Sequence, residues 1–381
     1  MNAILSKWRA GKGTFLLLSG VVACIAAAFA TGGADEPGFA GLVGAVFAGL
    51  AGGIVGTAAS SRRHWPVPAF SLLFDFLLAL VLLWLVRSAL PGSVGPLPGL
   101  PFWFFTVAAW LFAWSVVNRM SVFAAQGWLK SALGLAIPAL FGLTVLFLWE
   151  AVTRGFGIPF VLLPPPSAIG ARFAASIPLL WADFNQTVLK AVLFGFVVGS
   201  GAGFLVALLA DRYAFLANGL LPIGNLVSAL PIIGIAPVMV IWFGFDWQSK
   251  AAVVIVMTFF PMLVNALAGL SASGAMERDL MRTYASNHWQ ALFKLRLPAA
   301  LPFVFNALKI NSTLALIGAI VAEFFGTPIV GMGFRISTEV GRMNLDMVWA
   351  EIALAAIVGS LFYGAIALLE RAATFWHPSY R

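Results

Sequence analysis

The sequence has few of the residues on which most catalytic and metal sites depend. Its 381 residues include one cysteine and three histidines, and only 9% are charged. The single cysteine, Cys24, cannot form an intrachain disulfide or complete a common zinc site, and the histidines are far apart along the chain. The phosphate-binding pattern G-x-x-x-x-G-K-[ST] is also missing. We therefore expect a chain that is not an enzyme and that holds no metal or cofactor of its own.

Hydrophobic residues, in contrast, make up 61% of the chain, and its mean hydropathy is +0.99. Such values are typical of proteins that cross a membrane several times. A helix needs about 20 apolar residues to cross the hydrocarbon core. We count ten such segments, near residues 14–30, 39–59, 68–90, 101–117, 133–152, 186–210, 217–243, 249–273, 300–322 and 346–370. The sequence thus predicts an all-α polytopic membrane protein.

The charge distribution predicts how the chain is oriented. Its net charge is +8. If the N-terminus is cytoplasmic, the even-numbered loops and both terminal segments together hold fourteen basic and four acidic residues. This excess is typical of the cytoplasmic side of membrane proteins. The basic residues therefore indicate an orientation, with both termini in the cytoplasm, and do not indicate a surface that binds nucleic acid.

The chain divides into two blocks. Residues 1–130 contain four of the predicted spans, joined by short loops, whereas residues 131–381 contain six spans, longer loops and most of the prolines. The polar loop between Arg119 and Lys130 is the natural boundary. We expect the first block to be an accessory four-helix region beside the second.

Small residues recur every four positions in the second and sixth spans. The two sets are Gly41, Ala45, Gly49 and Gly53, and Gly195, Gly199, Gly203 and Ala207. Such ridges let helix backbones approach closely within a membrane. Packing inside one subunit and contact with another subunit are both compatible with this pattern.

Prolines and polar side chains mark candidate positions along a transport pathway. The seventh span contains three prolines, and the carbonyls that proline leaves unpaired need partners in protein or in a water-lined cavity, so the span is either a pathway wall or a structural kink.

Ionisable residues in spans are costly and therefore functional candidates, among them Asp75. We expect Lys309 to extend toward lipid or loop carbonyls. Glu323 either meets substrate or an external partner or forms a structural hydrogen bond. The candidate pathway-lining residues are Pro231, Pro237, Asn265, Asn311, Thr313 and Glu323.

The most informative segment is polar and interrupts the apolar pattern. Residues 277–302 read ERDLMRTYASNHWQALFKLRLPAALP, with aromatic and apolar residues at roughly helical spacing. We expect a short helix, a bend near 285–287 and a second short helix, with Pro298 starting the return to the membrane. A helical surface of this kind suits a groove on a soluble partner. A basic amphipathic helix suits an anionic membrane surface equally well, and the residues alone leave both alternatives open.

This segment resembles the EAA loop of binding-protein-dependent ABC importer permeases. In that pattern, EAA is followed after three residues by glycine and after nine more by I-x-L-P. Here LRLP stands at 295–298, Asp279 takes the place of the glutamate and Ala285 that of the glycine. The spacing therefore matches, while the residue types depart from the pattern, most notably at Asp279 and Ala285.

Five further motifs are similar to permeases for nitrate, sulfonate, taurine and thiamine-precursor pyrimidines. They are LPPPSAI (163–169), ALPIIGIAPVMVIWFG (229–244), FFPMLVNALAG (259–269), LPAALPFVFNALKI (297–310) and LIGAIVAEFFG (316–326). The resemblance covers about 131–377 and leaves 1–130 without a counterpart. It implies a six-helix type I permease core, with four additional N-terminal helices, in a bacterial inner membrane.

The resemblance also implies partners and contact residues. Two separate ATPase subunits would bind ATP and magnesium, a second permease copy or homologue would complete the pathway, and a periplasmic or lipid-anchored solute-binding protein would deliver substrate near 323–346. The coupling loop at 277–298 would contact the ATPase through Asp279, Arg282, Tyr284, Ala285, His288, Trp289, Gln290 and Pro298. The implied cargo is nitrate, a sulfonate such as taurine, a pyrimidine thiamine precursor or a riboflavin-like compound.

An ion-gradient-driven secondary transporter is the alternative. Such a protein would show inverted repeats and paired acids near the middle of the membrane. Asp75 is the one clear acid in the middle of a predicted span. The sequence therefore favours the importer permease.

Overall fold

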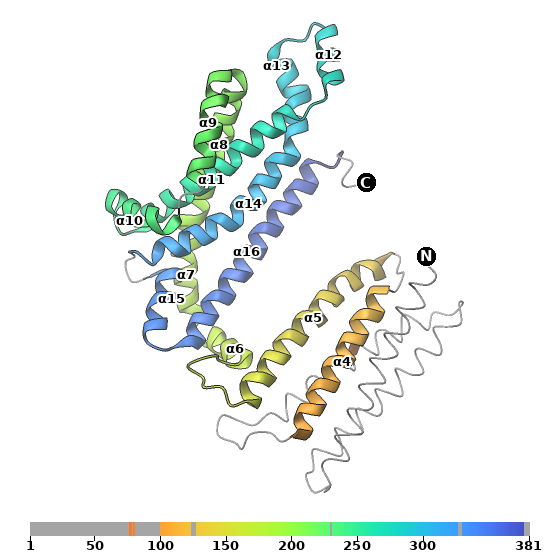
Figure 1. Cartoon of the computed structure of the whole chain (residues 1–381), viewed down its shortest axis with the longest axis vertical. Helices are drawn as coiled ribbons and strands as arrows, with labels where there is room; N and C mark the ends of the chain where they lie inside the picture. The colour runs from red at the N-terminus through yellow and green to blue at the C-terminus, as the bar shows by residue number, and fades with distance from the viewer. Residues whose placement is uncertain are drawn as a thin grey trace, which may run out of the picture. The chain divides into compact units, whose positions relative to one another are not determined.

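The computed structural model describes residues 76–77, 79–80, 100–122, 127–228, 231–326 and 330–376, and the regular elements in these ranges are all helices (Figure 1). By length and composition, five helices in the described ranges can cross a membrane: Trp128–Gly155, Ile177–Arg212, Trp247–Ser271, His288–Glu323 and Leu345–Ala373. The all-α prediction is confirmed for the residues that the structure describes. The predicted spans near 14–30 and 39–59, most of that near 68–90, Asp75 and the ridge that begins at Gly41 lie outside the described residues.

The chain forms two compact units, Met1–Ala168 and Ile169–Arg381, and each is described by itself. In the first unit, helices α4 (Leu100–Val122) and α5 (Trp128–Gly155) pack against each other. A Cβ atom on Gly155 would lie 2.7 Å from the ring of Trp103, so glycine permits the close approach there. The domain boundary at 130 stays a prediction.

The LPPPSAI motif is held against the end of α5. Glu150 is buried, and its carboxylate accepts hydrogen bonds from the Ser167 N–H at 2.8 Å and from the Ser167 hydroxyl at 2.5 Å. Arg154, one turn along α5, pairs with Glu150 at 2.7 Å. The motif then begins helix α6 (Pro166–Ala175), which starts on proline because the first helical position needs no N–H donor.

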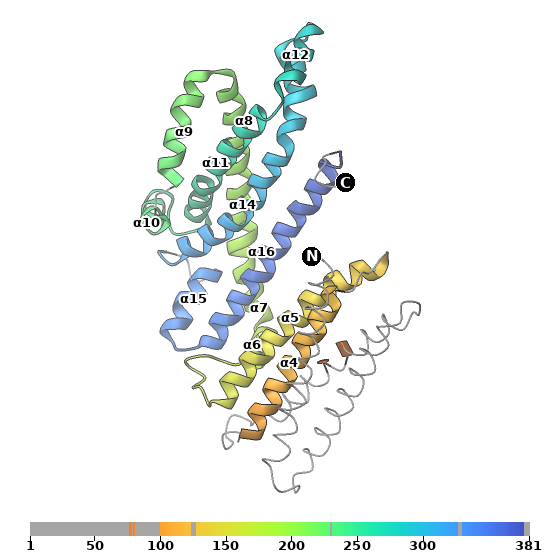
Figure 2. The same cartoon turned by 45° about the vertical axis from the view of Figure 1, so that its right-hand side comes forward.

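The second unit contains most of the described helices. Helix α7 (Ile177–Phe184), the π-helix η1 (Asn185–Val192) and α8 (Leu193–Arg212) join into one rod. They are followed by α9 (Ala214–Ser228), α10 (Ile232–Phe243), α11 (Trp247–Ser271), α12 (Ala275–Thr283), α13 (His288–Ala291), the π-helix η2 (Leu292–Arg296), α14 (Leu297–Glu323), α15 (Met332–Gly341) and α16 (Leu345–Ala373). In Figures 1 and 2, α11 lies beside both α8 and α14, and α16 lies beside α14.

The glycine ridge of the sixth span explains the contact between α8 and α11. Gly195, Gly199 and Gly203 are all buried. A Cβ atom on Gly199 would lie 2.1 Å from the Thr258 hydroxyl, and one on Gly203 would lie 2.4 Å from the Phe259 carbonyl. This ridge therefore packs inside the subunit, which settles the choice that the sequence left open.

The seventh predicted span, near 217–243, is two helices and not one. Helix α9 ends at Ser228, and α10 begins at Ile232 directly after Pro231. The 15 residues of α9 and the 12 of α10 are each too few for a straight crossing of about 30 Å of hydrocarbon. The proline-rich sequence thus breaks the helix, as proline's missing N–H predicts.

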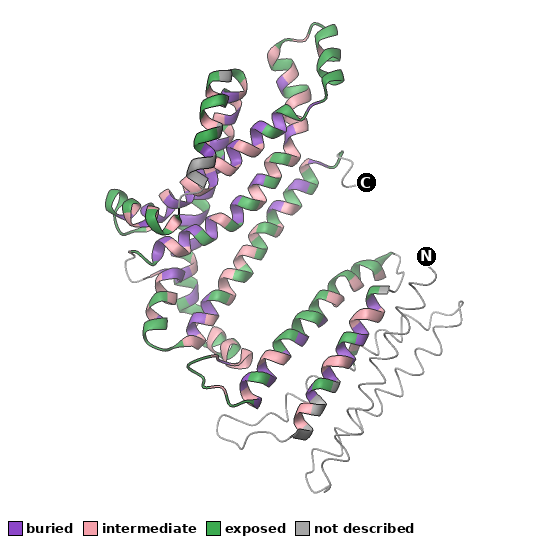
Figure 3. Cartoon of the chain, viewed as in Figure 1, coloured by how far each residue is buried: buried purple, intermediate pink, exposed green. Residues whose placement is uncertain are grey.

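Burial is uneven along the second unit (Figure 3). The helices α8, α11 and α14 supply most of its buried residues, whereas none of the residues that the structure describes in α12 and α13 is buried. Asn311 joins the three core helices, because its amide donates to the Ser200 hydroxyl at 2.9 Å and to the Thr258 carbonyl at 2.7 Å. The polar α12–α13 region therefore projects from a well-packed base.

Candidate functional site

The segment 275–296 folds as two short helices joined by a turn, as the sequence predicts. Helix α12 ends at Thr283, and α13 begins at His288. The Ser286 N–H and hydroxyl both donate to the Met281 carbonyl, at 3.0 and 2.7 Å, and close the turn. Pro298 lies in the first turn of α14, directly after the π-helix η2.

Two features of this segment go beyond the predicted pattern of helix, bend and helix: the backbone conformation of Ala285 and the position of Asp279. Ala285, at the position of the glycine in the EAA pattern, has a φ of 49°, in the left-handed region that costs a residue with a Cβ atom about 1–2 kcal/mol. Asp279, which stands at the glutamate of the EAA pattern, lies in the middle of α12 and not at its N-terminus; Glu277 occupies the first turn. A carboxylate at the N-terminus favours the helix dipole there.

Most of the predicted coupling residues are exposed. Tyr284 is 78% exposed and Trp289 is 64% exposed, and the Trp289 ring stacks on Phe293 with their centroids 6.1 Å apart. Asp279 and Arg282 form an exposed ion pair at 3.5 Å. Large aromatic side chains in water are typical of surfaces that a partner covers.

Two predicted residues of the segment have roles within α13. Asn287 accepts a hydrogen bond from the Gln290 N–H at 2.8 Å, and the Gln290 side chain accepts one from the Asn287 N–H at 2.9 Å. This reciprocal capping box gives a four-residue helix a fixed start. The ring of His288 contacts that of Trp289 edge-on, with centroids 5.8 Å apart. Gln290 and His288 thus help to hold Trp289 in place.

The base of the segment is tied to the core by Arg296, which the sequence analysis missed. Its guanidinium forms two hydrogen bonds with the Asp211 carboxylate at the end of α8, one of them 2.7 Å long. A third bond joins it to the Leu270 carbonyl of α11 at 3.1 Å. Both side chains are mostly buried, at 18% and 9% exposed. One arginine therefore links the segment to α8 and α11.

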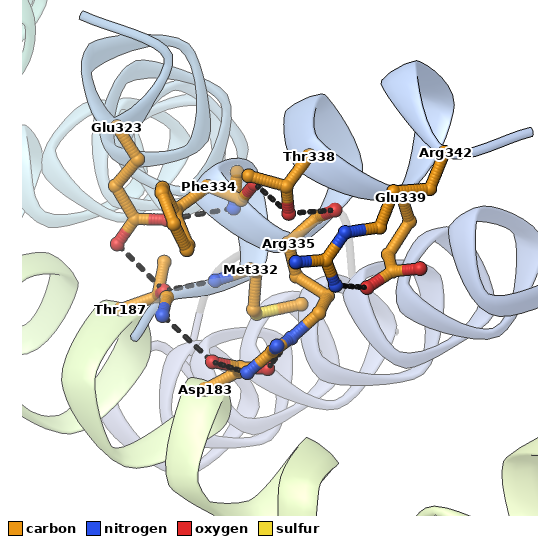
Figure 4. Close-up of polar contacts among 11 residues, drawn as sticks. Asp183, Thr187, Glu323, Met332, Phe334, Arg335, Thr338, Glu339 and Arg342 are labelled. Atoms are coloured by element: carbon orange, nitrogen blue, oxygen red, sulfur yellow. Dashed lines mark hydrogen bonds and ion pairs between the residues drawn. The ribbon is translucent and has the colours of Figure 1, made fainter. Parts of the chain in front are cut away.

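A buried polar cluster lies at the opposite end of the second unit, around α15 (Figure 4). We define the α15 cluster as Asp183, Thr187, Glu323 and Arg335. Asp183 and Glu323 are 0% and 2% exposed. Asp183 pairs with Arg335 at 2.9 Å, and the Thr187 hydroxyl donates to Glu323 at 2.7 Å. The cluster joins α7, η1, α14 and α15.

The cluster supplies the hydrogen-bond acceptors that the start of α15 needs. The N–H groups of Gly331, Met332 and Gly333 donate to Asp183, Thr187 and Glu323 at 2.7, 2.9 and 2.7 Å. The first N–H groups of a helix have no partner inside it. Gly331 has a φ of 142°, and a Cβ atom there would lie 2.7 Å from the Glu323 carboxylate. Elements far away in sequence thus fix the position of α15.

Further charged groups surround this cluster. Lys250 of α11 is buried, and its ammonium donates to the Phe245 carbonyl. Glu351 of α16 is also fully buried, beside the Asp183 carboxylate. Asp246 accepts hydrogen bonds from Trp247 and Gln186, both 2.7 Å long, and caps α11.

The pKa of Asp246 reflects these contacts. Its slight burial acts to raise the pKa, but the two hydrogen bonds and the ammonium groups of Lys190 and Lys250 outweigh this effect and lower it. Asp246 is therefore held as an anion at the start of α11, where the helix dipole favours negative charge.

The six candidate pathway-lining residues occupy different environments. Asn311 and Glu323 are buried in the contacts described above. The Asn265 amide donates to the Pro261 carbonyl at 2.8 Å, and the exposed Thr313 hydroxyl donates to the Ile310 carbonyl at 2.8 Å, so both hydrogen bonds stay within their own helices. Pro231 is exposed and Pro237 is half-buried. A pathway role for the six residues stays a prediction.

Lys309 has a different partner from the one that we expected. Its ammonium lies 2.8 Å from the Glu370 carboxylate of α16, and both side chains are mostly buried, at 19% and 8% exposed. We expected this lysine to extend toward lipid or loop carbonyls. The structure instead pairs it with an acid that lies 61 residues later in the sequence, near the end of α16.

The comparisons with known proteins agree with the sequence motifs. Residues 195–374 match the family described as "Binding-protein-dependent transport system inner membrane component". A probable ABC transporter permease protein of Haemophilus influenzae is 30% identical over 60% of this chain and 93% of its own length. The formylaminopyrimidine transport permease protein ThiX of Halalkalibacterium halodurans is 30% identical over 63% and 95%. The riboflavin transport system permease protein RibX of Chloroflexus aurantiacus is 29% identical over 65% and 91%. This multi-pass membrane chain therefore belongs to the inner-membrane permease family of binding-protein-dependent ABC transporters.

Proposed function

We propose that the chain is the transmembrane subunit of a type I ABC importer and that it transmits ATP-driven motion through the segment 275–296. The observation that carries this proposal is the contrast within that segment. Its aromatic residues Tyr284 and Trp289 are exposed, while Arg296 fixes its base to two core helices. A surface that is open to a partner and attached firmly to the core suits the transfer of force.

The proposed mechanism is alternating access. Two separate ATPase subunits close when they bind ATP, and each pushes on the 275–296 segment of one permease. Because Arg296 joins this segment to α8 and α11, the push moves the core helices together. A second permease, identical or homologous, forms the other wall of the pathway. A solute-binding protein delivers substrate at the end that contains α15. The four N-terminal spans form an accessory bundle.

The proposed substrate is a small nutrient. The related permeases named above transport riboflavin and formylaminopyrimidine. We therefore place a pyrimidine thiamine precursor and a riboflavin-like compound beside sulfonates, taurine and nitrate as candidates. A screen of these compounds by thermal shift, on a candidate solute-binding partner of this chain, would identify the substrate. An ion-gradient-driven mechanism is not favoured by any feature of the described residues.

The test of ATPase coupling is co-purification of the partner ATPase with variants of the full chain. Truncation of a central aromatic residue commonly costs about 2 kcal/mol or more of binding free energy, which is about 30-fold in affinity. We expect this loss for Trp289→Ala, together with loss of substrate-stimulated ATP hydrolysis. Asp279→Arg, which reverses a charge on the same surface, should also weaken binding.

The matched control is Trp181→Ala, because Trp181 is 61% exposed but lies on α7, at the α15 end of the unit. This variant should keep both ATPase binding and stimulated hydrolysis. If Trp289→Ala and Asp279→Arg together leave binding and hydrolysis unchanged, the segment does not couple the subunits, and an amphipathic surface that lies on lipid becomes the better explanation.

A further inference from the structure

A groove of about 410 Å³ lies between α4 and α5, inside the first unit. The two helices run side by side in both views (Figures 1 and 2). Trp110 and Trp114 of α4 and Phe141 of α5 line it, together with the buried Ala113. Trp114 and Phe141 are 52% and 60% exposed, so the groove is open at the surface. Its volume falls within the range of about 300–1,000 Å³ that is usual for small-molecule sites.

The middle of the groove offers little to a polar ligand. The Thr144 hydroxyl donates to the Leu140 carbonyl at 2.7 Å, and the Ser121 hydroxyl donates to the Asn118 carbonyl at 2.8 Å. These two hydroxyl donors are therefore already engaged within their own helices. Asn118 and Ser121, the most polar residues of the lining, lie together near the end of α4. The groove is thus apolar along its length and polar at one end.

The length of the groove corresponds to one leaflet of a membrane. Along α4 its lining extends from Trp110 to Ser121, which is about 16 Å of helix. This is about half of the 30 Å hydrocarbon core. Helix α4 has 23 residues, so Trp110 lies near its middle and Ser121 near its end. A linear apolar group that entered at Ser121 would reach approximately the centre of the membrane.

Basic residues lie near the ends of both helices where the chain passes from α4 to α5. Arg119 lies in the last turn of α4, and Lys130 is exposed in the first turn of α5. The sequence contains no acidic residue from Leu100 to Trp149. Trp128, two residues before Lys130 in the sequence and 80% exposed, is of the residue type that concentrates at membrane–water boundaries. Basic residues at the end of a helix pair attract anionic headgroups.

From this combination we infer that the groove binds one acyl chain of an anionic phospholipid, with the headgroup beside Lys130. The acyl chain belongs to a lipid of the leaflet on the basic side, which the sequence predicts to be cytoplasmic. This site is independent of the ATPase surface, because it lies in the other unit. The lipid would fill the space between α4 and α5 that their side chains leave open.

The test is native mass spectrometry of the full chain, stripped of lipid in detergent and titrated with phosphatidylglycerol or phosphatidylethanolamine. Val145 lines the groove and is 49% exposed, so Val145→Trp should fill the groove without entering the core, and should weaken the tightest phosphatidylglycerol site at least tenfold. Val152→Trp is the control, two turns along the same helix and 38% exposed. Lys130→Gln should weaken phosphatidylglycerol binding about fivefold, because one basic residue contributes about 1 kcal/mol near an anionic lipid.

Two outcomes would overturn the inference. Equal retention of phosphatidylglycerol by Val145→Trp and Val152→Trp would show that the groove is not the site. Equal binding of the two lipids by the unaltered chain, with no effect of Lys130→Gln, would show that the headgroup is not recognised. A folded Lys130→Gln variant keeps the second outcome informative even if Val145→Trp fails to fold.

Discussion

The second unit has two polar regions at its opposite ends, and they differ in how far their ion pairs are exposed. In the 275–296 segment, the paired side chains of Asp279 and Arg282 are 72% and 83% exposed. In the α15 cluster, the paired side chains of Asp183 and Arg335 are 0% and 13% exposed. The first pair is separated by three residues and the second by 152. The ion pair between residues close in sequence is thus exposed to water or to a partner. The ion pair between residues far apart in sequence is buried inside the fold.

The difference has an energetic consequence. An exposed ion pair contributes about 0–1 kcal/mol, because water competes for both charges. A buried pair adds little as a whole, but loss of one partner costs about 3–5 kcal/mol because the other charge stays buried and unpaired. We therefore expect substitutions at the two ends to separate stability from partner binding.

The largest expected effect is that of Asp183→Ala. It would leave Arg335 unpaired and the Gly331 N–H without its acceptor. We expect the free energy of unfolding to fall by about 3–5 kcal/mol. The change in stability is measured by heating the purified full chain and recording the fraction that stays monodisperse at each temperature. Asp279→Ala is the matched control and should alter stability by less than about 0.5 kcal/mol. Equal losses in the two variants would remove the distinction between the two ends.

The next effect concerns Asp211, which lies at the exposed end but is itself mostly buried. Asp211→Asn keeps the size of the side chain and removes the charge that faces Arg296. We expect the free energy of unfolding to fall by about 1.5–3 kcal/mol, the usual contribution of hydrogen bonds to charged groups. Hydrogen exchange should become faster across 275–296. Arg212→Gln, at the exposed neighbouring residue, should leave exchange in this segment unchanged; a similar acceleration there would mean that Arg296 does not anchor the segment.

A smaller and opposite effect is expected at Ala285. Glycine occupies the left-handed conformation without the strain that a Cβ atom imposes, although it also makes the unfolded chain more flexible. Ala285→Gly should therefore stabilise the turn by about 0.5–1 kcal/mol. Slower exchange of the amides near 284–288 is the readout. Ala291→Gly, inside helix α13, should have the reverse effect, and faster exchange in both variants would contradict the assigned strain.

The smallest expected effect is that of Arg282→Ala. Its partner Asp279 is exposed, so the free energy of unfolding should change by less than about 0.5 kcal/mol. ATPase binding by the same variant should weaken, since Arg282 lies on the proposed contact surface. Arg335→Ala is the comparison that sharpens this result, because it removes the partner of a buried carboxylate. A destabilisation of Arg282→Ala as large as that of Arg335→Ala would be inconsistent with the exposure of the pair.

The sequence predicts the exposed region better than the buried one. The sequence analysis took 217–243 as one span and left two kinds of contact open for the ridge at Gly199, and the structure decided both points. The bend near 285–287, in contrast, follows from residues that are close together in the chain. The α15 cluster does not, because Asp183 and Arg335 are separated by 152 residues and neither has a local signal beyond being an ionisable residue in an apolar region.

The same reason explains the misplaced lysine. An apolar stem with a charged end predicts that Lys309 extends toward the membrane surface. Its actual partner, Glu370, is on another helix, and no local pattern in either helix specifies that the two would face each other. Pairing across helices depends on their relative rotation, which one sequence does not contain.

The continuous helix Ile177–Arg212 connects the two polar regions directly. It carries Asp183, which holds the start of α15, near one end, and Asp211, which holds Arg296, at the other, about 40 Å away. Its glycine ridge leaves no room to slide along α11. The helix can therefore act as a lever whose two ends are both fastened by carboxylates. In the proposed mechanism, a tilt that starts at the 275–296 segment would reach α15, at the other end of this unit, as a pull, without any chain of side-chain rearrangements between them.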